Sequence, residues 1–178
     1  MSEMHFEEIA STNEFLKEFA KKGAPDRSFV SADRQSAGHG QYQRCFESPP
    51  GGLYFSLLLK TEKYGDDVSN ITAEIGKIMQ RQVLELFGVT AEIKAPNDLL
   101  ANGKKLCGIL CESFVQDGIL NIIIGVGLNV NTLPEDYSKE LRNNAVSIRM
   151  LTGKSYELSD ILCRIKKNIN LFLDNYGG

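Results

Sequence analysis

The 178-residue sequence contains no tryptophan and only two histidines, His5 and His39. Its four cysteines, at positions 45, 107, 111 and 163, form no Cys-x-x-Cys pair, and their spacing fits neither a zinc site nor a disulfide framework. Cys107 and Cys111 stand four residues apart in a predicted strand, which places them on one face. We interpret this pair as buried free thiols, since cysteine is among the residues most often buried.

Long apolar runs and charge blocks are also missing. No apolar run approaches the roughly 20 residues that span a bilayer, and the first residues lack the basic and apolar regions of a signal peptide. We therefore expect no membrane association and a cytoplasmic location. The formal net charge is -3 and the lysines are spread along the chain, so we expect no nucleic-acid partner.

What is present predicts one α+β domain, in which a mixed sheet packs against helices. Expected strands cover residues 6–10, 28–32, 53–60, 91–94, 105–116 and 119–130, with a hairpin turn at 116–118 and residues 122–124 buried on both faces. Expected helices cover residues 66–88, 134–151 and 159–173, and a first helix runs to Gly23 from a capping box formed by Ser11 and Glu14. The loop 33–52 is too long for a simple connection, so we expect it to be functional or disordered.

Three polar stretches are candidates for chemistry. Ser11-Thr12-Asn13 is foremost a helix start, because these residue types occupy N-caps. Glycines in the loop 33–52 allow backbone N–H groups to turn toward an anion, and such a loop can close over a reactive intermediate. Glycines nevertheless mark ordinary turns as often as ligand sites. His39 as a metal ligand or general base is an alternative that lacks evident partner residues.

Two lysines form the third candidate. Lys94 and Lys105 each stand at the end of a predicted strand, and the turn at Pro96 would bring both ammonium groups to one site. There they would neutralise charge that develops when a carboxylate attacks a phosphate. Solvated strand-end lysines are the plainer interpretation. Downstream, Gly125 and Gly127 permit close backbone approach, although glycine often merely marks a strand bulge.

In order and spacing, Ser11-Thr12-Asn13, the glycine-bearing loop, Lys94-Ala95-Pro96-Asn97-Asp98, Lys104-Lys105-Leu106-Cys107-Gly108 and Gly125-Val126-Gly127-Leu128-Asn129 resemble the biotin protein ligases. The resemblance implies a class II synthetase-like biotin/lipoate ligase catalytic domain. It implies ATP-dependent activation of biotin to biotinyl-AMP, with Mg²⁺, and transfer to a lysine of the biotin carboxyl carrier protein of acetyl-CoA carboxylase. A homodimer is a further possibility by analogy.

The resemblance also implies site residues. Lys105 and Lys94 would be catalytic. Biotin would be bound by Ser11, Thr12, Asn13, Gln35, Gly38, His39, Gly40, Gln41, Lys105 and Gly108. The nucleotide would be bound by Arg44, Phe46, Asn97, Gly125, Gly127 and Asn129. No residue is assigned to a resident metal.

The loop departs from the pattern of the family. Two arginines are replaced by His39 and Gln41, a glycine by Gln43 and a tryptophan by Phe46, and Ala95 stands where tryptophan is usual. Neither histidine nor glutamine reproduces the bidentate fork with which arginine binds phosphate. A catalytically impaired biotin-binding paralogue is therefore one alternative. A lipoyl or octanoyl transferase is another, because Asn97-Asp98 and Lys104-Lys105 with Gly108 also resemble lipoate ligases.

The resemblance runs from about residue 9 to residue 172. We therefore expect residues 1–178 to form a single catalytic domain, without the N-terminal DNA-binding domain or the C-terminal β-domain that many members of the family carry.

Overall fold

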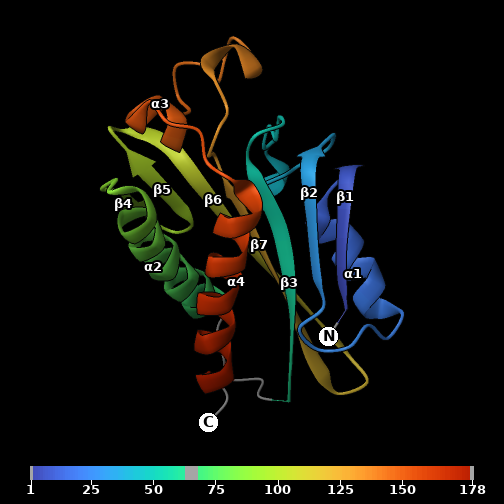
Figure 1. The fold of residues 1–178 in the computed structure, drawn as a ribbon. Coiled ribbons are helices and arrows are strands. Elements are labelled where there is room, and N and C mark those ends of the chain that lie inside the picture. Colours follow the sequence, from blue (N-terminus) through green and yellow to red (C-terminus); the bar gives the residue numbers. More distant parts are fainter. Residues whose placement is uncertain (1, 63–67, 177–178) are drawn as a thin grey trace.

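The computed structural model describes residues 2–62 and 68–176 (Figure 1). Their strands form one mixed sheet in the order β1-β2-β3-β7-β6-β5-β4. β1 runs parallel to β2, and every other neighbouring pair in this order is antiparallel. The strands are β1 (Glu3–Ile9), β2 (Phe29–Gln35), β3 (Leu53–Thr61), β4 (Glu92–Lys94), β5 (Asp98–Ala101), β6 (Lys104–Gln116) and β7 (Ile119–Leu128). The predicted α+β class is confirmed.

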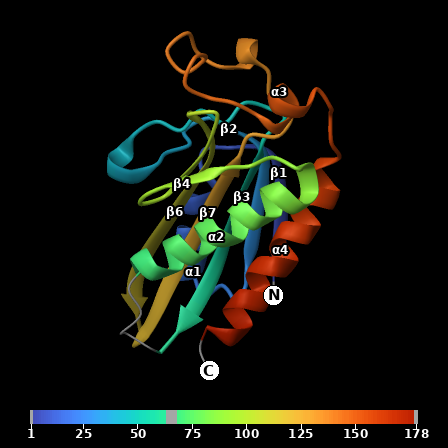
Figure 2. The same ribbon diagram turned by 90° about the vertical axis from the view of Figure 1, so that its left-hand side faces the viewer.

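Helices cover both faces of the sheet (Figures 1 and 2). α1 (Thr12–Lys21) packs on one face against β2, β3 and β7, whereas α2 (Val68–Phe87) and α4 (Leu158–Asn175) pack on the other. Both faces of the sheet need covering, because side chains along a strand such as β7 alternate between the two faces and enter two different cores. Ile123 joins the core under α1, while Ile122 and Ile124 join the larger core under α2 and α4. The predicted burial of residues 122–124 on both faces is confirmed.

Several helix and turn boundaries are as the sequence predicted them. Ser11 is the N-cap of α1 and accepts a hydrogen bond from the Glu14 amide at 3.4 Å. The Glu14 carboxylate turns toward His39 instead of completing a capping box. The hairpin between β6 and β7 turns at Asp117 and Gly118, both with positive φ. Residues 66 and 67 of the predicted helix 66–88 lie outside the described residues.

The predicted helix 134–151 is wrong. This segment contains the 3₁₀ helix η2 (Pro134–Asp136), an irregular stretch and the short helix α3 (Ile148–Thr152). Its backbone pairs with the start of β6, because the Lys105 amide donates to Asn144 and Lys105 accepts from the Val146 amide. Backbone groups bound to a strand cannot also complete a helix.

Strand β5 was not predicted. It is four residues long and turns into β6 through Asn102 and Gly103, which both have positive φ. The loop ahead of β3 contains the 3₁₀ helix η1 (Gln41–Gln43). Within residues 2–62 and 68–176, no helix has the length and apolar character needed to cross a membrane.

Candidate functional site

A pocket opens on the α1 face of the sheet, where the N-terminus of α1 meets β6 and β7. The loop between β2 and β3 borders it on a further side. Its lining residues come from segments spread over most of the chain, and they are Ser11, Thr12, Asn13, Gln35, His39, Gly40, Phe46, Asn97, Lys105, Gly108, Ile109, Leu110, Gly125, Val126 and Gly127. Twelve of the seventeen site residues predicted from the sequence stand in this lining. The five that lie outside it are Lys94, Gly38, Gln41, Arg44 and Asn129.

One end of the pocket is a cluster of uncharged polar side chains. Gln35 Oε1 accepts from the Thr12 amide at 2.8 Å and from the Thr12 hydroxyl at 3.1 Å. Ser56 Oγ lies 2.8 Å from Thr12 Oγ1 and 2.6 Å from Asn13 Oδ1. Asn13 Nδ2 donates in turn to Glu112 Oε2 at 3.0 Å. These mutual hydrogen bonds hold donors and acceptors in fixed positions at the pocket wall.

Glycines in β6 and β7 make room for side chains that shape the pocket. A Cβ atom at position 125 would lie 2.1 Å from Asn13 Oδ1, and one at position 127 would lie 2.5 Å from the Phe46 ring. At Gly108 the same ring would be 3.0 Å away. Gly125 and Gly127 therefore admit Asn13 and Phe46 close to the sheet, which is a packing role beside the predicted nucleotide contact.

Lys105 lies at the other end of the pocket. Its Nζ is 2.8 Å from Asp98 Oδ1 and 5.2 Å from the centroid of the Phe46 ring. The pairing of β5 with β6 shifts register between Leu99 and Leu100, which face Cys107 and Lys105 respectively. Without this shift, strand alternation would point Lys105 to the face opposite Gly108. The irregularity brings a cation into the pocket.

Lys94 stands directly opposite Asp98 across β4 and β5, so both side chains share the pocket face of the sheet. Lys94 is nevertheless exposed and does not line the pocket. The structure thus brings Lys105, but not Lys94, into the lining, and the catalytic role of Lys94 stays a prediction.

The side chains of the two asparagines predicted to contact the nucleotide both donate hydrogen bonds to backbone carbonyls. Asn97 lines the pocket and donates to the Ile109 carbonyl at 2.9 Å. Asn129 is buried outside the lining and donates to the carbonyls of Lys105 and Val146 at 3.2 and 3.0 Å. In this arrangement Asn129 fixes the backbone that carries Lys105.

The glycine-bearing loop forms a small flap, defined here as residues 38–46. The Phe46 amide donates to the Gly38 carbonyl at 2.9 Å, and the Gly40 amide donates to the Arg44 carbonyl at 2.8 Å. His39 pairs with Cys45 between these bonds.

The flap presents different side chains on different sides. Phe46 and His39 line the pocket. Gln41 borders a neighbouring groove, and exposed Arg44 lies over the ring of Tyr42 at 5.9 Å. Gly38 is buried, and a Cβ there would lie 2.6 Å from the Phe46 carbonyl. The side chain of Gln43 lies outside what the structure describes.

Two residues that hydrogen-bond to the polar end of the pocket, Ser56 and Glu112, were not predicted from the sequence. Ser56 appeared only as one residue of an apolar predicted strand, and Glu112 as one residue of another. Each is a polar residue within an otherwise apolar strand. Such a residue indicates a hydrogen-bond partner, because buried polar groups need partners. Their partners are 43 and 99 residues away in sequence, which local pattern cannot supply.

The buried thiols take no part in the pocket. Burial raises the pKa of Cys107 to about 12 and that of Cys111 to about 11. Both thiols therefore stay protonated near neutral pH. The interpretation of Cys107 as a buried free thiol is confirmed. For Cys111 it is only partly right, because this residue is free but half-buried.

The profile of the Biotin/lipoate A/B protein ligase family matches residues 5–129, and the chain belongs to this family. The Bifunctional ligase/repressor BirA of Bacillus subtilis is 33% identical over 159 residues, which cover 88% of this chain and 49% of BirA. The Biotin--[acetyl-CoA-carboxylase] ligase of Paracoccus denitrificans is 28% identical over 166 residues, covering 87% of this chain and 68% of the relative. The chain spans about half the length of the two Bacillus BirA relatives it matches.

Among solved structures, the biotin protein ligase from Aquifex aeolicus in complex with biotin and ATP superimposes with a TM-score of 0.85 at 28% sequence identity. The match covers 98% of this chain and 71% of that one. The resemblance to the catalytic domain of biotin protein ligases, and the fold that it implies, are confirmed.

Proposed function

We propose that this protein activates biotin with ATP to biotinyl-AMP and transfers the biotinyl group to a lysine of a biotin carboxyl carrier domain, such as that of acetyl-CoA carboxylase. The observation that carries the proposal is the order of groups along the pocket. Hydrogen-bonding side chains without charge, including Asn13, stand at one end, the Phe46 ring lies between, and Lys105 stands at the other end.

That order matches the chemistry of biotin. Its ureido head is uncharged and needs a few well-placed donors and acceptors in an apolar pocket. Its tail is aliphatic and ends in a carboxylate. Gly125 underlies Asn13 and Gly127 underlies Phe46, and two strand residues span about 7 Å. A head bound at Asn13 would thus direct its aliphatic tail past Phe46 toward Lys105.

The reaction has two steps. A carboxylate oxygen of biotin attacks the α-phosphorus of ATP, the bond to the bridging oxygen breaks, and pyrophosphate leaves. The carrier lysine amine then attacks the acyl carbon, loses a proton and displaces AMP. Lys105 orients the carboxylate and offsets negative charge near the phosphate. The flap, through Phe46 and His39, covers the mixed anhydride and excludes water.

Mg²⁺ would arrive with the nucleotide. None of the residues that line the described pocket is acidic, and the nearby carboxylate of Asp98 is paired with Lys105. Mg²⁺ usually keeps several waters and is held largely by substrate phosphates, and it neutralises their charge. The need for ATP also favours the predicted cytoplasmic location.

An alternative is a protein that binds biotin without forming the adenylate. The specific observation in its favour is that no arginine lines the described pocket, and the flap arginine Arg44 is exposed. The lipoyl alternative receives less support, because the dithiolane head of lipoate has no use for the hydrogen-bonding cluster at Thr12, Asn13 and Gln35.

The test is ATP- and biotin-dependent labelling of a purified carrier domain, with free biotinyl-adenylate measured in parallel. Lys105→Ala is expected to abolish adenylate formation while leaving the circular dichroism spectrum unchanged. Lys94→Ala is expected to weaken it. The matched control is Lys104→Ala, because this lysine precedes Lys105 but does not line the pocket.

Each outcome separates the candidates. Labelled carrier in the wild type, lost in Lys105→Ala alone, supports the ligase. Tight biotin binding without adenylate supports the impaired paralogue. Thermal stabilisation by lipoate and not by biotin supports the lipoyl alternative. Full activity in both Lys105→Ala and Lys94→Ala would contradict the roles given to these lysines.

A further inference from the structure

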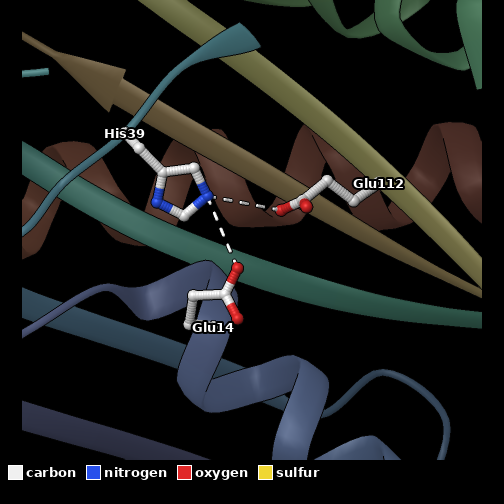
Figure 3. A group of neighbouring side chains, drawn as sticks. All are labelled: Glu14, His39 and Glu112. Atoms are coloured by element: carbon white, nitrogen blue, oxygen red, sulfur yellow. Dashed lines mark ion pairs between the residues drawn. The ribbon is translucent and has the colours of Figure 1, made fainter. Parts of the chain in front are cut away.

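Three metal-ligating side chains converge beside the pocket, each from a different element (Figure 3). Glu14 extends from the first turn of α1, Glu112 from β6 and His39 from the flap. His39 Nε2 lies 3.5 Å from Glu14 Oε1 and 3.9 Å from Glu112 Oε2, and all three donor atoms lie within 4.8 Å of one another.

The imidazole nitrogen is the atom that points to a ligand. His39 Nε2 is buried and has no hydrogen-bond partner, although it faces two carboxylates. A buried nitrogen without a partner is unfavourable. A bound cation would give it one, because neutral imidazole binds metals through this atom.

The donor set and spacing favour Zn²⁺. Imidazole with carboxylates suits Zn²⁺ better than Mg²⁺ or Ca²⁺, which prefer oxygen ligands alone. Bonds of ~2.0–2.2 Å around a tetrahedral ion place ligand atoms roughly 3.3–3.6 Å apart. The distance from His39 to Glu14 already falls in that range, and the half-exposed Glu14 side chain is free to approach Glu112. Water would complete the coordination.

Neighbouring charges are compatible with a dication. The two carboxylate oxygens of Glu112 have different partners: Oε1 lies 3.4 Å from the Lys17 ammonium, and Oε2 faces His39. Oε2 also accepts from Asn13 Nδ2, a neutral donor that orients the carboxylate as outer partners of metal ligands do. With a neutral imidazole, Lys17 balances one of the two carboxylates, and one negative charge remains.

We propose that Glu14, His39 and Glu112 form a Zn²⁺ site that fastens the flap to α1 and β6. His39 is the metal ligand that the flap supplies. At the base of the flap, the Phe46 amide donates to the Gly38 carbonyl and the Phe46 ring lies against Gly108 and Gly127 of the sheet. A cation bridging His39 to two rigid elements holds the flap against the pocket. Zn²⁺ is then a ligand that controls how freely the pocket opens, independently of what the pocket binds.

The first test is calorimetric titration of the metal-free protein with Zn²⁺ alone. We expect one equivalent to bind, a rise in the melting temperature, and slower hydrogen exchange at the amides of Gly40 and Phe46. Glu14→Gln and His39→Ala should each weaken Zn²⁺ binding by at least about tenfold, since even outer partners of metal ligands are worth that much. Glu14→Gln keeps the Ser11 cap, so it tests the site without loss of the helix.

His5 supplies the matched control. It is the other histidine of the chain, and its Nε2 lies 3.3 Å from one carboxylate, that of Asp33, on the exposed edge formed by β1 and β2. His5→Ala should leave Zn²⁺ binding and flap exchange unchanged.

The exposed thiols of Cys45 and Cys163 are the competing ligands. Titration with Co²⁺ distinguishes them, because a thiolate adds a near-ultraviolet charge-transfer band and the proposed site would not. The proposal is overturned by Zn²⁺ binding that survives both Glu14→Gln and His39→Ala, by a thiolate band, or by no binding at all. None of these results bears on biotin activation, which is measured separately with carrier labelling.

Discussion

Replacing Gly125 with alanine tests the packing that shapes the pocket. The added Cβ would lie 2.1 Å from Oδ1, 2.8 Å from Cγ and 2.9 Å from Nδ2 of Asn13. The amide is the end of a flexible side chain, so steric overlap alone could be relieved by rotation. Rotation is costly because Asn13 is 5% exposed and bonded to Ser56, Glu112 and the Leu110 carbonyl.

The magnitude follows from those bonds. Leaving a buried polar group without a partner costs about 1–3 kcal/mol, and in a protein of this size each kcal/mol lowers the melting temperature by roughly 2–4 °C. We therefore expect Gly125→Ala to destabilise the fold by about 1–3 kcal/mol and to lower the melting temperature by roughly 2–12 °C. If the proposed function is right, biotin affinity also falls, because Asn13 is displaced.

The matched control is Gly76→Ala in α2. A Cβ there would lie 3.8 Å from Ile109 Cδ1, an ordinary contact, and alanine within a helix is favoured over glycine by up to about 1 kcal/mol. Urea unfolding of the two variants should therefore give shifts of opposite sign. An unfolding midpoint for Gly125→Ala equal to that of the wild type would refute the packing argument, whatever the effect on biotin.

Three further predictions concern the reactivity of the thiols, the pH dependence of stability and the role of Asn129. In the native protein at pH 8, a thiol reagent should modify the exposed Cys45 and Cys163 rapidly, the half-buried Cys111 more slowly, and the buried Cys107 only after unfolding. Rapid reaction of Cys107 in the native protein would contradict its burial. Burial raises the pKa of Cys107 from an ordinary 9.0 to about 12. Between these two pH values the folded state keeps a proton that the unfolded state loses. The contribution of this thiol to the free energy of unfolding should therefore be present below about pH 9 and fall as the pH rises toward 12. Asn129→Ala removes the donor to the Val146 carbonyl and should lower the free energy of unfolding, measured in urea, by about 1–3 kcal/mol. Because the same side chain fixes the backbone of Lys105, adenylate formation should fall as well. Unchanged stability would contradict the role given to Asn129.

The elements predicted correctly are those whose causes are close in sequence. The Ser11 cap bonds to an amide three residues away, and the hairpin at residues 116–118 needs only two residues with positive φ. The apolar period of residues 159–173 likewise predicted α4 (Leu158–Asn175), because a helix repeats its buried face every three to four residues. Such signals are complete within a short window of sequence.

The predicted helix 134–151 failed for the opposite reason. Its composition permits a helix, but Asn144 and Val146 bond to Lys105, about 40 residues earlier in the chain. No local pattern reports a partner at that separation, and tertiary pairing overrides a weak propensity. The four-residue strand β5 escaped prediction because it depends on β4 and β6 on either side.

The sequence by itself determined the residue types that the pocket needs and their order along the chain, which was enough to identify the family and to single out Ser11-Thr12-Asn13, Gln35 and Lys105. Only the tertiary structure decided how they meet. The register shift between β5 and β6 sends Lys105 to the pocket face, the glycines of β7 admit Asn13 and Phe46, and His39 meets Glu14 and Glu112. These relations join elements far apart in sequence, and side chains on neighbouring strands and helices acquire neighbours only when the sheet has formed.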